Sequence, residues 1–125
     1  MTTLQVNLGE HSYPIYIEQG FHSLAVSISP QLKSRRIIII SNETVWPLYG
    51  EQVMAELQNY DVSYFLIPDG EAYKTLEMYA QIQTFLLEQG ASRDVNLIAL
   101  GGGVVGDLTG FVAATYQRGV NFVQI

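Results

Sequence analysis

The sequence predicts an α/β fold: a Rossmann-like, mostly parallel sheet flanked by helices, with an N-terminal β-hairpin. Residues 35–41 contain four consecutive isoleucines, which is typical of a strand buried on both faces. From there, short apolar runs alternate with segments of helical spacing, which implies parallel strands joined by right-handed crossovers. A run of three glycines after residues 95–100 indicates a tight turn from a strand into a helix.

The first half of the chain supplies the hairpin, two helices and the isoleucine strand. Alternating runs at 4–8 and 13–17 flank a polar connection and predict the hairpin, with Pro14 indicating an edge strand. Residues 21–28 predict a short helix before Pro30. Residues 42–60 predict a helix, which Pro47 and Gly50 could divide into two pieces.

The second half repeats the strand–helix alternation. Strands are expected at 62–68, 95–100 and 120–125, and a helix from the glycine run to about 117–119. Between the first two strands, residues 75–90 predict a helix that Gly90 caps. Its expected apolar stripe consists of Leu76, Tyr79, Ile82 and Leu86.

Length, charge and cysteine content limit the function classes. The 125 residues suit one domain with its own core. A net charge of −6 argues against nucleic-acid binding, which needs clustered cations. The chain has no cysteine, and its N-terminus resembles neither a signal peptide nor a membrane span, so we expect a cytoplasmic protein. His11 and His22 lack partners at metal-ligand spacing, so no metal site is expected.

The glycine run is the strongest candidate for a binding site. Gly101, Gly103 and Gly106 fit G-x-G-x-x-G between a strand and a helix, where the free N–H groups of the first helical turn bind phosphate. The alternative is a tight turn with close helix–sheet packing. Three adjacent glycines favour a ligand, because glycine costs roughly 0.5–1 kcal/mol where a side chain would serve.

The acidic residue that usually binds the ribose about 20 positions later is missing, since nothing acidic follows Asp107. Asp69 and Glu71 follow the preceding strand and are the candidates for that role. Such a carboxylate would select NAD over NADP by repelling a 2′-phosphate. The alternative is a solvated turn. Lys74 could hold Glu71 in place or meet a phosphate.

Three further residues have two interpretations each. Asp107 in the first helical turn either complements the helix dipole or faces the nicotinamide. Asn42 either caps the following helix or contacts a ligand. Arg118 either suits a helix C-terminus or binds a phosphate bidentately. Because the carboxyl ends of parallel strands share one edge, segments 42–44, 69–74 and 101–107 are expected to converge there.

Three stretches, "LGGGVVGDLTGFVAATYQRG", "IPDGEAYK" and "SNETVWPLY", resemble the 3-dehydroquinate synthase family of the shikimate pathway, which leads to chorismate and aromatic amino acids. The resemblance runs along essentially the whole chain. It implies a lyase that converts the seven-carbon keto-sugar acid phosphate DAHP to 3-dehydroquinate with release of phosphate, using NAD transiently. It also implies a homodimer, in which each subunit has an NAD-binding and a metal-binding domain.

The resemblance also assigns residues. It implies adenosine-ribose contacts at Asp69, Gly70, Glu71, Ala72, Tyr73 and Lys74. It implies pyrophosphate and nicotinamide contacts at Gly102, Gly103, Val104, Val105, Gly106 and Asp107, with Asn42 as a further cofactor contact. Arg118 matches an arginine that contacts substrate phosphate, with a neighbouring subunit's site as one option.

The family continues beyond the position of Ile125 with the ligands of a divalent metal, Zn or Co. We therefore expect residues 1–125 to be the NAD-binding domain of a truncated enzyme, inactive alone and without catalytic or metal-ligating residues. The alternatives are another sugar-phosphate cyclase, a metal-dependent glycerol or alcohol dehydrogenase, or a stand-alone nucleotide-binding module.

Overall fold

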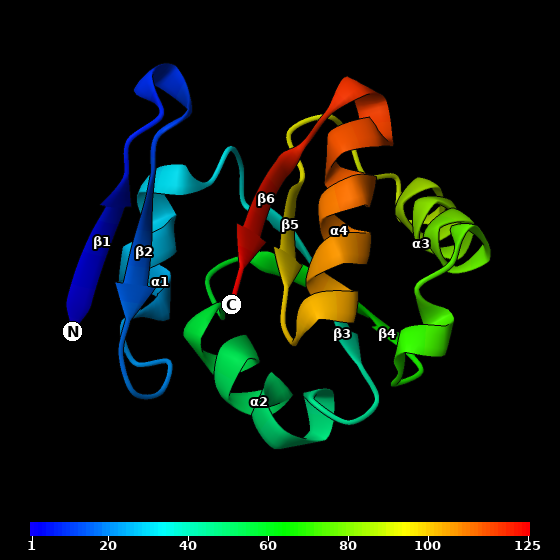
Figure 1. Ribbon diagram of the computed structural model, residues 1–125, viewed down its shortest axis with the longest axis horizontal. Coiled ribbons are helices and arrows are strands. Elements are labelled where there is room, and N and C mark those ends of the chain that lie inside the picture. The colour runs from blue at the N-terminus through cyan, green and yellow to red at the C-terminus, as the bar shows by residue number, and fades with distance from the viewer.

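Two separate sheets organise the computed structural model, which describes all of residues 1–125 (Figure 1). The hairpin pairs β1 (Thr2–Val6) with β2 (Tyr13–Ile17) in antiparallel register. The main sheet is entirely parallel, in the order β4-β3-β5-β6. Its strands are β3 (Arg36–Asn42), β4 (Asp61–Ile67), β5 (Asn96–Ala99) and β6 (Asn121–Gln124). The predicted fold class is confirmed.

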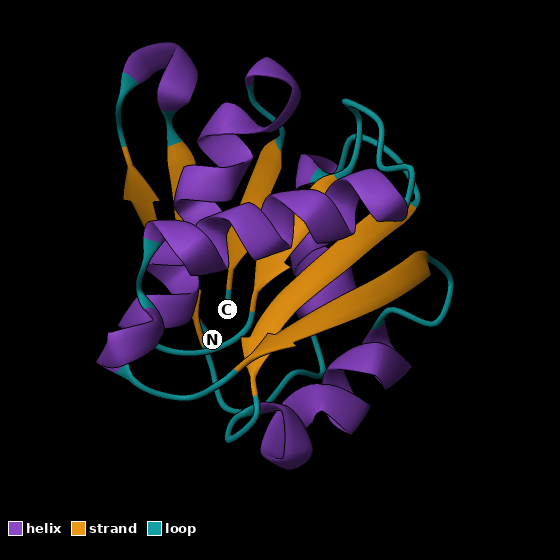
Figure 2. Ribbon diagram, turned by 90° about the vertical axis from the view of Figure 1, so that its right-hand side faces the viewer, coloured by secondary structure: helices purple, strands orange, loops and turns teal.

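Helices cover both faces of the main sheet (Figure 2). They are α1 (Leu24–Ile28), α2 (Trp46–Glu56), α3 (Leu76–Glu88) and α4 (Gly103–Thr115). The isoleucines of β3 are fully buried and point alternately to two cores: Ile38 and Ile40 pack with α3 and α4, Ile37 and Ile39 with α1 and α2. The isoleucine run is thus the doubly buried strand that its composition predicts.

The predicted break in the helix of residues 42–60 is wrong, because α2 is one continuous helix. Pro47 lies in its first turn, where the missing N–H is not needed. Gly50 is buried against the indole of Trp46, and a Cβ there would lie 2.5 Å from the ring. This glycine therefore serves close packing inside the helix rather than a break.

The apolar stripe of α3 differs from the prediction at its first residue. Met78, Ile82 and Leu86 are buried, and Tyr79 is half-buried, whereas Leu76 is 76% exposed. At 3.6 residues per turn, Leu76 lies roughly 120° from the centre of the buried stripe. The predicted cap is confirmed: Gly90 has φ +66°, and the N–H of Ala91 donates to the Leu86 carbonyl at 3.0 Å.

A buried amide joins the amino ends of three strands. The Oδ1 of Asn96 accepts from the Lys33 N–H and from the Nδ2 of Asn121, both at 2.8 Å. Its Nδ2 donates to the carbonyls of Ser34 at 3.0 Å and Arg36 at 2.9 Å. The side chain is fully buried, so these four bonds fix β3, β5 and β6 relative to one another.

None of the helices has both the length and the apolar character needed to cross a membrane.

Candidate nucleotide-binding site

The two central strands, β3 and β5, form a topological switch point. The chain leaves β3 through α2 on one face of the sheet and leaves β5 through α4 on the other. In open parallel sheets, ligands bind beyond the carboxyl ends of the strands at such a point. The glycine turn follows β5, so it lies at the place where this rule puts a ligand.

The glycines of the turn have different roles. Gly101 has φ +149°, which strains any residue with a side chain, and a Cβ there would lie 3.2 Å from Val105. Gly102 and Gly103 are exposed and have no positive φ, and a Cβ on either would meet nothing within 4 Å. Neither folding geometry nor packing therefore requires glycine at these two positions. The space above them is open to a ligand.

The first turn of α4 presents uncapped main-chain N–H groups to this space. Gly102 is the N-cap residue, and no side chain caps the helix. The N–H of Gly106 donates to the Gly102 carbonyl at 3.0 Å and begins the helical bonding. The preceding N–H groups, together with the helix dipole, favour an anion at this end.

Asn42 and Asp69 join the ends of β3 and β4 beside the turn. The Oδ1 of Asn42 accepts from the N–H groups of Thr44 (3.0 Å) and Val45 (2.7 Å). Its Nδ2 donates to Asp69 at 3.3 Å, and the Thr44 hydroxyl donates to the other oxygen of Asp69 at 2.9 Å. These bonds hold the turn of residues 43–45, and the predicted role of Asn42 as an N-cap is wrong, because the N-cap residue of α2 is Val45 and no side chain caps that helix. The sequence analysis did not predict that Thr44 bonds to Asp69. Its position two residues after Asn42, next to the carboxyl end of β3, could have indicated this contact.

Lys74 connects the loop of residues 69–74 to α4. Its Nζ lies 2.9 Å from Asp107 and 3.5 Å from Glu71. The hydrogen bond and charge of Asp107, followed by the charge of Glu71, raise the pKa of Lys74 above its ordinary 10.5.

The expected convergence of segments 42–44, 69–74 and 101–107 is confirmed, because Thr44 bonds to Asp69 and Lys74 pairs with Asp107. The predicted place of Asp107 in the first turn is wrong: it is the fifth residue of α4 and pairs with Lys74 instead of the helix end.

We expect Asp107→Asn to lower the pKa of Lys74 and to loosen the loop from α4. A group whose pKa is raised in the folded state stabilises the fold at pH values below its pKa in the unfolded chain. This stabilisation is lost as the pH rises through the pKa of the folded state. The ion pairs therefore act at neutral pH and disappear in strong alkali. NMR titration of the lysine side chain would measure this in a Lys33→Arg background, where Lys74 is the single lysine. An unchanged Lys74 titration in the Asp107→Asn variant would contradict the assignment.

Arg118 lies away from the glycine turn. It follows α4, whose 13 residues span about 20 Å at 1.5 Å per residue. Arg118 sits at φ +66° in the 3-10 turn Tyr116–Arg118 and forms no ion pair. The structure therefore does not bring Arg118 to the glycine turn of the same chain.

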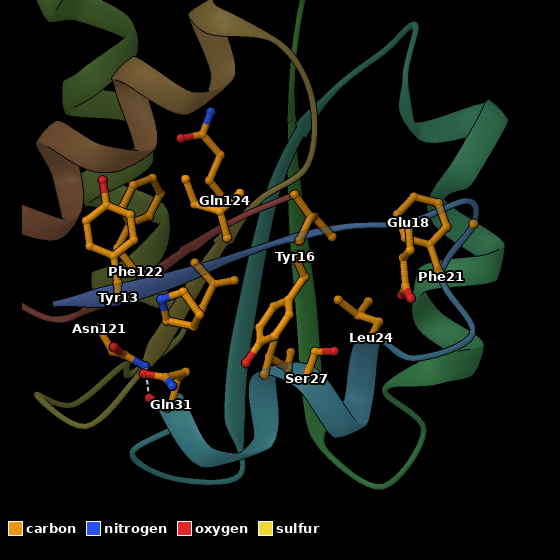
Figure 3. A pocket seen from close by; sticks show the side chains of 16 residues that line it. Tyr13, Tyr16, Glu18, Phe21, Leu24, Ser27, Gln31, Asn121, Phe122 and Gln124 are labelled. Atoms are coloured by element: carbon orange, nitrogen blue, oxygen red, sulfur yellow. Dashed lines mark hydrogen bonds between the residues drawn. The ribbon is translucent and has the colours of Figure 1, made fainter. Parts of the chain in front are cut away.

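A cavity of about 910 Å³ between the hairpin, α1 and β6 is a separate feature (Figure 3). Its lining is mainly apolar and includes Ile15, Tyr16, Phe21 and Phe122. It approaches the glycine turn through Gln124, which lines the cavity and also contacts the Gly106 position. The sequence analysis did not identify Gln124 as a candidate. Its position at the carboxyl end of β6, the edge of the sheet where ligands bind, could have indicated it.

No group of three or more aspartate, glutamate or histidine side chains lies close enough to hold a metal ion. The residues of this chain therefore do not fit a divalent metal site.

Comparison with known proteins agrees with this geometry. The family described as 3-dehydroquinate synthase N-terminal matches residues 64–125. A 3-dehydroquinate synthase of Pseudomonas aeruginosa is 51% identical over the whole chain, which covers 34% of that protein. One of Shewanella pealeana is 53% identical over 96% of the chain and is also covered to 34%. The chain thus spans about a third of the length of these curated relatives.

Solved structures of sugar-phosphate cyclases share the fold. A 2-deoxy-scyllo-inosose synthase, described as complexed with carbaglucose-6-phosphate, NAD⁺ and Co²⁺, superimposes with a TM-score of 0.87. It is 25% identical and matches 99% of this chain and 35% of its own. The 2-epi-5-epi-valiolone synthase of Streptomyces hygroscopicus, described with NAD⁺ and Zn²⁺, gives a TM-score of 0.70 at 31% identity over 95% of this chain and 33% of its own. On this evidence the chain belongs to the 3-dehydroquinate synthase family and matches the N-terminal part of its members.

Proposed function

We propose that residues 1–125 bind NAD⁺ and form the dinucleotide-binding domain of a 3-dehydroquinate synthase, which converts DAHP to 3-dehydroquinate and phosphate. One observation carries the binding proposal: the uncapped end of α4 lies at the switch point, under open space above Gly102 and Gly103. The two cyclase structures described with NAD⁺ support it. The relatives at about 50% identity support the synthase activity.

The residues of this chain have distinct roles in that proposal. The N–H groups of the turn from Gly102 to Val105 bind the diphosphate. Glu71 accepts from ribose hydroxyls, while Lys74 holds Glu71 and the loop against Asp107. When bound, NAD⁺ supplies a reversible hydride acceptor.

The remaining parts of the enzyme lie outside these contacts. We place the metal ligands in polypeptide beyond residues 1–125, because this chain has no suitable group of side chains.

We also propose a cytoplasmic homodimer. Arg118 would serve the substrate phosphate of the neighbouring subunit, since about 20 Å of helix separates it from its own glycine turn.

A domain exchange tests the synthase assignment. Residues 1–125 would replace the matching part of the Pseudomonas aeruginosa 3-dehydroquinate synthase, which is 51% identical. The chimera is expected to retain synthase activity. A folded, NAD⁺-binding chimera without activity would favour the second candidate, another sugar-phosphate cyclase, which the structural similarity to 2-deoxy-scyllo-inosose synthase suggests.

We expect NAD⁺ to bind about tenfold more tightly than NADP⁺, a difference of about 1.4 kcal/mol. The reason is that the carboxylate of Glu71 faces the 2′ position and repels a phosphate there. Glu71→Gln is expected to reduce the ratio to about twofold. Glu77→Gln, which removes an exposed carboxylate from the first turn of α3, should leave the ratio unchanged. Calorimetric titration of both nucleotides measures these ratios, and equal affinities in the unmodified chain would contradict the role of Glu71.

A further inference from the structure

Gln124, at the end of β6, lies beside the glycine turn. It pairs in parallel register with Ala99 of β5. The next residue, Ile125, donates its N–H to the Ala99 carbonyl at 2.8 Å and accepts from the Gly101 N–H at 3.2 Å. The main chain around Gln124 is therefore fixed directly to the residues that begin the glycine turn.

The side chain of Gln124 extends from β6 onto α4. A Cβ at Gly106 would lie 2.5 Å from its Nε2, 3.0 Å from Cδ and 3.4 Å from Oε1. The carboxamide thus occupies the space that the missing side chain of Gly106 leaves free. Figure 3 shows this amide turned toward the helix rather than into the cavity.

The Gln124 carboxamide makes no hydrogen bond within the protein, and the residue is exposed to solvent. Gly106 follows Gly102 by four residues, which is about 6 Å along a helix. An unpartnered amide donor is therefore held about one turn from the uncapped N–H groups of α4.

We propose that Gln124 is a further dinucleotide-binding residue, whose Nε2–H donates to an oxygen of the diphosphate bound on the first turn of α4. This inference rests on the proposed NAD⁺ binding. An amide suits the position because it donates without bringing a charge of its own. A glutamate of the same shape would place a second anion beside the diphosphate. The lack of a side chain at Gly106 then has a functional reason, since it seats the Gln124 amide.

The experiment measures the affinities of NAD⁺, ADP and adenosine by calorimetry, together with the thermal midpoint. Gln124→Leu keeps the bulk and removes the donor, so it is expected to weaken NAD⁺ and ADP about tenfold, the usual effect of losing a hydrogen bond to a charged group. Gln124→Glu is expected to weaken them further. Adenosine lacks the diphosphate, so its affinity should not change. Gln52→Leu, an exposed glutamine on α2, is the matched control.

A double-mutant cycle separates this role from packing. Gly106→Ala is expected to weaken ADP binding in the unmodified chain, because its Cβ displaces the Gln124 amide. In a Gln124→Ala background it should cause no further loss, because the amide is already gone. Additive losses would overturn the proposed coupling.

The remaining outcomes are distinguishable. Gln124 variants that bind ADP like the unmodified chain, alongside a Gly103→Val variant that does not bind, would overturn the role of Gln124 and leave NAD⁺ binding intact. An unmodified chain that binds neither NAD⁺ nor ADP would overturn both proposals.

Discussion

Replacement of Gly103 by valine is expected to abolish dinucleotide binding while leaving the fold intact. Gly103 is the first residue of α4, and a Cβ there would meet no atom within 4 Å. A valine therefore fits the folded chain but fills the space where a diphosphate approaches the main chain. Losing two charge-assisted hydrogen bonds would weaken binding at least about 100-fold.

Trp46 provides the measurement, because it is the only tryptophan and begins α2 two residues after Thr44, whose hydroxyl donates to Asp69. Titration with NAD⁺ is followed by its fluorescence, and the fold by circular dichroism. Gly110→Ala in the same helix is the control, since its Cβ would make an ordinary 3.5 Å contact with Phe122. Collapse of the Gly103→Val variant would show that this glycine has a packing role.

Truncation of Asn96 to alanine is expected to lower the free energy of unfolding by about 2–4 kcal/mol. The change removes four hydrogen bonds of a fully buried side chain, three of them to part-buried main-chain groups of Lys33, Ser34 and Arg36. A domain of this size has about 5–15 kcal/mol of stability, so the variant should remain folded but melt at a lower temperature.

Urea denaturation measures this loss. Asn7→Ala is the matched control, because Asn7 is exposed in the hairpin connection, and its truncation should change stability by less than about 0.5 kcal/mol. If Asn96→Ala were as stable as this control, the Asn96 network would not hold the strands together.

The order of elements could be predicted because it depends on local patterns. The isoleucine run fitted a doubly buried strand better than an amphipathic helix, and Gly90 marked the end of α3. The errors came from packing that composition does not show. Gly50 suggested a break in α2, but it packs against a ring one turn away, and Leu76 fitted a helical stripe but lies outside the buried face.

The site could be predicted only in part. Fold rules placed the glycine turn and the loop of residues 69–74 at one edge, and the contacts of Lys74 and Asp69 confirm that placement. The partners themselves could not be predicted, because they depend on how far side chains reach across that edge. Asp107 therefore pairs with Lys74, and Gln124 crosses to Gly106.

NMR of the main-chain amides during NAD⁺ titration tests the central claim most directly. The ¹H–¹⁵N signals of Gly102, Gly103 and Val104 are expected to move and saturate together, while those of Arg118 and Gly119 at the far end of α4 stay in place. Shifts confined to the hairpin cavity at Ile15 and Phe122, with unchanged glycine signals, would contradict the claim that the open end of α4 binds the diphosphate.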